Sequence, residues 1–438
     1  MNKKANPLNR TNSEQSLYKK CYPWIVISLC ASFLFYKYIL QVFPSVMTTQ
    51  LMQVLHVDGA GLGVLTASYF YTYLIAQLFI APLMDRYSPR LLSTLALGIS
   101  ALGAFCFAMS HGLFSAAFAR GLIGVGAAFA TVSYMKLAVI WFKPRQFAFV
   151  GGLLATAAMM GSIVGQTPLA FLVEHQGWQM SLIDCAVLGV VLMVAFYVIV
   201  RDKNPDQPEA THNDQGGHAK WKELVDVLKH KHNWYLMLYS GLAFCPLSIF
   251  GGLWGNPFLE EAYHLNILQA ASLTSCLFLG LALGAPILGL ISDRLGKRYE
   301  IMVFGLLLSV VCLITVLYAP TLPYGVLGLA LFLLGFGTGA FMLCFAVGRE
   351  LNSAWVAATV VAVINSGDAI FGSFTEPLIG KILDLGWTGQ IVKGVHYFNL
   401  HSYHLALAIL PLYLLLAFFF LSRLKKPCMA KQQDEISH

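Results

Sequence analysis

A few charged and polar residues lie inside long apolar stretches of the sequence, and their side chains are the best candidates for chemistry. Lys37 and Arg120 are cations that could bind a carboxylate, a phosphate or a sulfonate. Asp368 follows Asn365 by three residues and precedes Glu376 by eight, so all three share one side of a helix. A carboxyl group in this setting could bind an amine or take up and release a proton. The pattern predicts recognition of a small charged solute.

Each of these side chains also has a structural alternative. Lys37 could form an ion pair or extend toward the outer interface, and Arg120 could bind neighbouring backbone carbonyls. Asp368 could pair with either cation, and Glu376 lies near Lys381, with which it could form a surface ion pair. We expect Lys37, Arg120 and Asp368 to contact substrate, and Asp368 and Glu376 to be the proton-coupling sites.

Further substrate contacts are predicted from local patterns. Tyr69 and Tyr73 are four residues apart and share a helix face. Trp254 and Asn256 lie in a glycine-rich stretch with a proline, which is typical of a gating or broken helix. For Trp254, a place in the aromatic belt at the outer interface is the alternative. The complete set of predicted substrate contacts is Lys37, Gln41, Tyr69, Tyr73, Arg120, Trp254, Asn256, Asn365 and Asp368.

Several other kinds of chemistry have no signature in the sequence. There is no GxxxxGK[ST] phosphate-binding loop, no metal-ligand spacing and no nucleophile with a recognisable base. The nine cysteines are scattered singly, so packing is their expected role. We therefore expect no enzymatic activity, no cofactor, no metal and no nucleic-acid partner.

The composition indicates that the lipid bilayer is the solvent of this chain. Of 438 residues, 58% are hydrophobic and 11% are charged, which is far from the composition of a soluble domain. The apolar residues form stretches of about 20, long enough to cross the hydrocarbon core as helices. Twelve such spans are predicted: 23–48, 61–84, 91–110, 113–136, 147–172, 178–200, 234–259, 267–291, 301–319, 323–347, 355–380 and 402–422.

The distribution of basic residues predicts the orientation of these spans. Lys37, Arg120, Lys381 and Lys393 are the only lysines and arginines outside the segments that would be cytoplasmic if the N-terminus is cytoplasmic. Cytoplasmic loops carry an excess of Lys and Arg, so both termini are expected in the cytoplasm. The predicted location is the inner (cytoplasmic) membrane.

A polar segment divides the predicted spans into two sets of six. Residues 201–232 contain prolines and glycines followed by an amphipathic-looking stretch at 221–228, as in a linker with a short surface helix. The predicted organisation is a cytoplasmic tail at 1–22, a six-helix bundle at 23–200, the linker at 201–232, a second six-helix bundle at 233–424 and a cytoplasmic tail at 425–438.

A short charged sequence recurs after the second and the eighth span. The first copy runs from Ala81 to Arg90 (APLMDRYSPR) and the second from Gly289 to Arg298 (GLISDRLGKR). A carboxylate next to basic side chains at a helix end can form a latch that closes in one conformation and opens in another. Ordinary topogenic charge is the alternative. The predicted latch residues are Asp85, Arg86, Arg90, Asp293, Arg294 and Arg298.

The second copy resembles the GxLaDRxGrR signature of the major facilitator superfamily, and the first copy keeps its Asp-Arg and its terminal arginine. The resemblance implies an all-α membrane protein whose two pseudo-symmetric six-helix bundles alternate around a central cavity lined by the first and fourth spans. A finer resemblance, through Ala119–Gly126 and Val139–Lys143, is to transporters related to the lysosomal dipeptide carriers. The acidic residue expected in that branch is replaced by Ala127 and Ala128.

These observations lead to one expectation about function and two alternatives. We expect a monomeric secondary transporter in the bilayer that carries out proton-coupled uptake or exchange of a small zwitterion or anion, with an amino acid or short peptide favoured. The first alternative is a transporter of an organic anion, a sugar phosphate or a siderophore. The second, from another class, is a membrane receptor that does not transport.

Overall fold

The structure is a computed structural model that describes residues 7–142, 146–202, 227–319, 321–352, 356–392 and 394–436. Within these ranges it describes the backbone but not the side chains of residues 7–20, 81, 82, 85, 147–149, 357, 358 and 425–436. Most of the predicted linker therefore lies outside the described residues, and of the expected short helix at 221–228 only the last two residues are described, both in a helical conformation.

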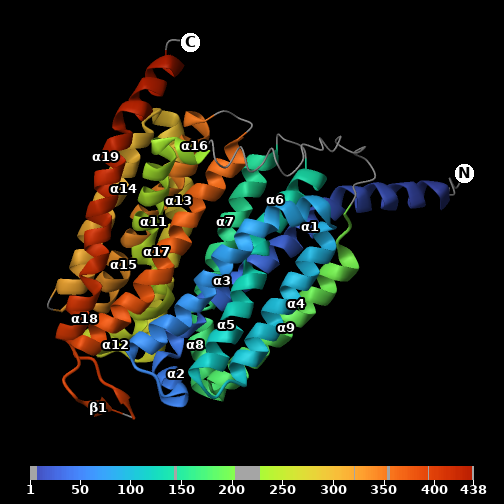
Figure 1. Ribbon diagram of the computed structural model, residues 1–438. Helices are drawn as coiled ribbons and strands as arrows, with labels where there is room; N and C mark the ends of the chain where they lie inside the picture. Colours follow the sequence, from blue (N-terminus) through green and yellow to red (C-terminus); the bar gives the residue numbers. More distant parts are fainter. Residues whose placement is uncertain are drawn as a thin grey trace, which may run out of the picture.

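The first half of the chain forms long helices that lie side by side (Figure 1). They are α1 (Pro7–Val42), η1 (Phe43–Val46), α2 (Thr48–Leu55), α3 (Gly59–Arg86), α4 (Pro89–Ala108), α5 (Leu113–Ala127), α6 (Phe129–Trp141), α7 (Phe147–Val164), α8 (Thr167–Gln176) and α9 (Trp178–Ile199). Because α1 already begins at Pro7, part of the segment predicted as a tail continues the first helix.

The second half forms a comparable set of helices beside the first (Figure 1). They are α11 (Lys231–Ile249), η3 (Phe250–Trp254), α12 (Gly255–Tyr263), α13 (Ile267–Leu295), α14 (Arg298–Tyr318), α15 (Tyr324–Thr338), η4 (Gly339–Met342), α16 (Leu343–Leu351), α17 (Ala357–Leu385), α18 (Leu400–Leu407) and α19 (Ile409–Ile436). A hairpin that the sequence analysis did not predict, β1 (Ile391–Val392) and β2 (Val395–His396), lies between α17 and α18.

Most of the predicted spans are apolar helices long enough to cross a bilayer. In the described part of the chain, 11 helices meet this requirement by length and composition. The helix α17 is not one of them, although its 29 residues would reach about 43 Å. It carries Asn365, Asp368 and Glu376, which are polar residues in an otherwise apolar helix. Its position against α3 and α11 places these polar side chains inside the protein.

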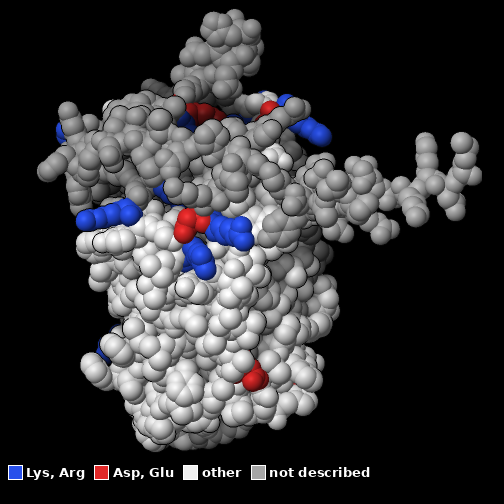
Figure 2. Space-filling view, turned by 90° about the vertical axis from the view of Figure 1, so that its right-hand side faces the viewer, with Lys and Arg blue, Asp and Glu red and all other residues white. Residues whose placement is uncertain are grey.

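The surface of the protein matches a membrane environment. Charged side chains gather near the end that carries both termini, and a broad surface with few charges extends from there toward the opposite end (Figures 1 and 2). Many large hydrophobic residues of the described chain are exposed, for example Leu78, Phe118 and Val198. Because lipid tails are apolar, such side chains are stable there.

The two halves contact each other closely at the end opposite the termini, where α3 meets α17. The two helices approach so closely that a Cβ atom added at Gly380 would lie 2.0 Å from the Gly59 carbonyl oxygen. Only glycine fits such a contact. The Asp384 carboxylate of α17 also accepts hydrogen bonds from the backbone N–H groups of Gly59 and Ala60, at 2.9 and 2.7 Å. This end of the protein is therefore closed.

Candidate functional site

Lys37 lies in α1 and is almost completely buried, with 5% of its surface exposed. Its ammonium lies 4.5 Å from the ring centroid of Tyr38 and 4.9 Å from that of Tyr73 on α3. Aromatic faces attract a cation and partly replace its hydration. In the described part of the chain, no carboxylate oxygen lies within 4.0 Å of this ammonium. Its hydrogen-bond donors therefore remain available to another group.

Asp368 lies on α17, in the other half, and is partly buried. It accepts a hydrogen bond of 3.0 Å from the hydroxyl of Ser240, which is fully buried on α11. Asn365, one turn earlier on α17, interacts with Tyr73. Lys37 and Asp368 interact electrostatically, although they form no direct ion pair. Opposite charges from the two halves thus face each other without contact.

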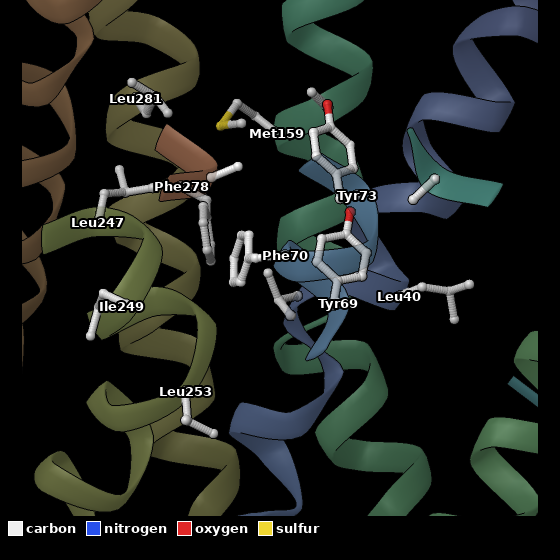
Figure 3. Packing of buried hydrophobic residues seen from close by; sticks show 14 of the residues in the cluster. Leu40, Tyr69, Phe70, Tyr73, Met159, Leu247, Ile249, Leu253, Phe278 and Leu281 are labelled. Atoms are coloured by element: carbon white, nitrogen blue, oxygen red, sulfur yellow. The ribbon is translucent and has the colours of Figure 1, made fainter. Parts of the chain in front are cut away.

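Tyrosines of α3 form one side of this site. Tyr69 and Tyr73 stack with ring centroids 6.0 Å apart, and the Tyr69 hydroxyl donates a hydrogen bond of 3.4 Å to the Gln41 side-chain oxygen. Figure 3 shows Tyr69 and Tyr73 one above the other on α3, and Phe70 pointing toward Phe278 in the other half. The structure therefore brings Gln41, Tyr69 and Tyr73 together with Lys37, as expected for one site.

Arg120 lies near this cluster but is committed to the backbone of α1. Its guanidinium donates hydrogen bonds to the carbonyl oxygens of Leu40 and Gln41, the latter at 2.6 Å. The Leu40 carbonyl lacks a helical partner because residue 44 is a proline without an N–H group. Arg120 is 1% exposed and packs between the rings of Phe43 and Tyr69. In this conformation Arg120 therefore has the structural role that was its alternative: it binds backbone carbonyls and caps the end of α1.

The surface ion pair with Lys381, which was the structural alternative for Glu376, does not form in this conformation. Glu376 is buried, with 3% of its surface exposed, whereas Lys381 is exposed. The reason is the close crossing of α17 and α3, where a Cβ atom at Gly63 would lie 2.5 Å from the Glu376 carbonyl oxygen. One carboxyl oxygen of Glu376 has no hydrogen-bond partner among the described residues, and the carboxyl group interacts electrostatically with Arg120.

Trp254 and Asn256 are both fully buried. Trp254 ends η3, a single π-helical segment, so the seventh predicted span is indeed irregular at this point. Asn256 donates hydrogen bonds to the Ser45 carbonyl oxygen at 3.1 Å and to the Gln166 side-chain oxygen at 2.8 Å. In this conformation neither residue is exposed to a solute, and the aromatic-belt alternative for Trp254 does not hold because its side chain is inside the protein.

The predicted latch residues make contacts within their own halves. Arg298 binds Asp293 at 3.0 Å and Glu350 of α16 at 2.6 Å. In the first half, Arg90 donates from its backbone N–H to Asp202 at 2.8 Å and from Nε to the Tyr197 carbonyl at 2.7 Å. Arg86 lies over the neighbouring Tyr87 ring, and Arg294 is exposed. The side chain of Asp85 lies outside the described residues.

This arrangement of helices and buried charges can be compared with known proteins. The sequence model of the Major Facilitator Superfamily matches residues 25–375 and 236–435. The chain belongs to the Major Facilitator Superfamily. The resemblance expected from the charged repeat is thereby confirmed, as is the all-α membrane fold.

Relatives within the superfamily differ in what they carry. A probable L-galactonate transporter of Escherichia coli (strain K12) is 25% identical over 389 residues, which cover 83% of this chain and 81% of the relative. A lysosomal dipeptide transporter of Danio rerio is 24% identical over 310 residues, 66% of this chain and 67% of the relative. Membership of this superfamily of transporters makes the chain a multi-pass membrane protein that acts on a small molecule.

A solved structure shows the same fold over nearly the whole chain. It is a bacterial homologue of the human lysosomal transporter Spinster in an inward-facing and unoccupied conformation, with a TM-score of 0.76 and 15% identity. The alignment covers 94% of this chain and 98% of that one.

The sequence analysis missed some residues that contact the candidate site of this protein. Tyr38 was overlooked as a partner of Lys37, and Ser240 as a partner of Asp368, because neither type is unusual in an apolar span. Gln166 was not among the predicted contacts, although an amide inside an apolar span must find hydrogen-bond partners when it is buried, as it is here. Among the described residues, no group of three or more His, Cys, Asp or Glu side chains could hold a metal ion.

Proposed function

We propose that this protein is a secondary active transporter that binds the acidic group of a small organic solute at Lys37 and couples its movement to a proton at Asp368. The observation that carries this proposal is the position of Lys37 and Asp368. They interact electrostatically from opposite halves of the protein but form no direct ion pair. A charge at bilayer depth costs roughly 2.5–3.5 kcal/mol on insertion scales, and a direct ion pair would reduce that cost. Because the protein instead surrounds each charge with neutral groups, a solute can take the place between them.

The chemistry of the site favours a zwitterion or an anion. Lys37 supplies a cation for a carboxylate or phosphate, and Asp368 with Asn365 supplies acceptors for an amine or hydroxyl groups. Galactonate and dipeptides, named for two of the relatives, both carry a carboxylate. We favour a zwitterion such as an amino acid or short peptide, and keep a simple organic anion as the alternative.

The conformation supports alternating access as the mechanism. We propose that the closed end, where α3 crosses α17, faces the outside and that both termini lie in the cytoplasm, as the basic loops predict. The contacts of Arg298 with Glu350, and of Arg90 with Asp202, would then belong to the inward-facing state. In the outward-facing state these latch residues would exchange partners.

A thermal-shift screen of the purified protein tests this proposal. The panel contains amino acids, dipeptides, sugar acids, sugar phosphates and nucleosides, because a ligand that binds only the folded state stabilises it by about 2.7 kcal/mol at 100 times its Kd. We expect stabilisation by a carboxylate-bearing solute and none by its neutral amide or alcohol analogue. Equal stabilisation by the charged solute and its neutral analogue would contradict the assignment of Lys37.

A further inference from the structure

Two buried amide side chains connect the halves at the closed end. Gln166 lies between α7 and α8 in the first half, and Asn256 lies in α12 in the second. The Gln166 amide nitrogen donates to the Ser45 hydroxyl at 2.9 Å and to the Gly251 carbonyl oxygen at 2.7 Å. The Asn256 amide nitrogen donates to the Gln166 side-chain oxygen at 2.8 Å and to the Ser45 carbonyl oxygen at 3.1 Å.

The network is completely enclosed and internally satisfied. Gln166, Asn256 and Ser45 have no exposed surface. The Asn256 side-chain oxygen accepts a hydrogen bond of 2.6 Å from Thr274, whose side chain is also buried. Because an unpaired buried amide costs more than its hydrogen bond contributes, the network favours the state in which the halves are together.

The contact with Gly251 reaches into the irregular part of the seventh span. Gly251 belongs to η3, where the N–H of Gly255 donates to the carbonyl of Phe250 five residues earlier. Such π-helical turns are rare and often occur at functional sites. Gln166 donates to a carbonyl inside this turn. Separation of the halves would therefore remove a hydrogen bond from the irregular segment of the seventh span.

We infer that Gln166 is the positioning residue that holds the pathway closed at the end opposite the termini, through the Gly251 carbonyl of the π-helical turn and the side chain of Asn256. The inference rests on the proposed alternation between two states. Opening at this end must break each of these contacts between the halves, and water or solute must then satisfy both amides. Gln166 thereby sets the balance between the closed and the open state.

Distance measurements between spin labels test this role without any solute. Labels are placed at Gly112 and Gly325, at the closed end of either half, where a Cβ atom would meet nothing within 4 Å. A genetically encoded keto amino acid carries the labels, so that the native cysteines stay unmodified. Gln166→Leu removes the amide, and Gln166→Glu keeps its size but replaces two N–H donors, both in use, with at most one O–H donor. Thr167→Val is the matched control, because it removes a neighbouring contact between the halves, to Ser275 at 2.8 Å, that does not involve the π-helical turn.

We expect both Gln166 variants to raise the ratio of the long-distance to the short-distance population about tenfold, and Thr167→Val to raise it no more than about threefold. An unchanged ratio in both Gln166 variants would overturn the inference. An equal change in Thr167→Val would also overturn it, since any loosening of this interface would then suffice. A gate that opens as expected in a protein that no solute stabilises would refute the proposed substrate site and leave the role of Gln166 intact.

Discussion

Replacement of Lys37 by alanine is expected to lower solute uptake by roughly 10- to 100-fold at concentrations below KM, the range that loss of one charge-assisted hydrogen bond produces. The ammonium lies over two aromatic rings, so its strongest electrostatic interaction in the loaded protein would be with the solute. The measurement is initial uptake into proteoliposomes of the solute that the thermal-shift screen identifies.

Two further variants make the Lys37 result specific. Lys381→Ala removes an exposed lysine of α17 and is expected to leave uptake within about twofold of the wild type, as is usual for surface substitutions. Lys37→Arg keeps the charge but replaces a compact ammonium with a planar fork, so it should restore binding only in part. Undiminished uptake by Lys37→Ala would remove this residue from the site.

Replacement of Asp368 by asparagine is expected to abolish accumulation driven by a proton gradient while preserving exchange of labelled for unlabelled solute. Asparagine resembles the protonated carboxyl and can still accept the Ser240 hydrogen bond, but it cannot release a proton. The two measurements are uptake under an imposed pH gradient and counterflow without one. Accumulation should fall at least about tenfold, because the coupling itself is lost.

Glu376→Gln is the parallel test for the second buried carboxyl group. Glu376 stays a predicted proton site, but it is enclosed at the crossing of α17 and α3, whereas Asp368 is partly exposed. We therefore expect a smaller loss of accumulation for Glu376→Gln than for Asp368→Asn. Full gradient-driven accumulation in Asp368→Asn would exclude the proton role of Asp368. Loss of counterflow for zwitterions alone would show that binding of their amine also requires the negative charge of Asp368.

The sequence was sufficient to predict the fold and to single out Lys37 and Asp368 as candidates for the site. A span of about 20 apolar residues has few structural choices in a bilayer, and a charge within it stands out because of its cost. The sequence did not show that Lys37 is held by Tyr38 and Tyr73, or Asp368 by Ser240, because these contacts depend on how helices far apart in the chain pack together.

Two differences from the sequence analysis have local physical causes. The role of Arg120 depends on Pro44, which leaves the Leu40 carbonyl without a helical partner, so the signal was present in the sequence but distant from the arginine. The alternative of a surface ion pair for Glu376 came from the nearby Lys381, whereas the glycines of α3 allow α17 to pack so closely that the glutamate is enclosed.

The most direct test of the proposed site is an electron cryo-microscopy structure of the protein with the stabilising solute. The acidic group of the solute should lie within hydrogen-bond distance of Lys37 Nζ, with the rest of the molecule between α1 and α17 and within reach of Asp368 and Asn365. Solute density elsewhere in the protein, with Lys37 still held only by Tyr38 and Tyr73, would contradict the proposed site.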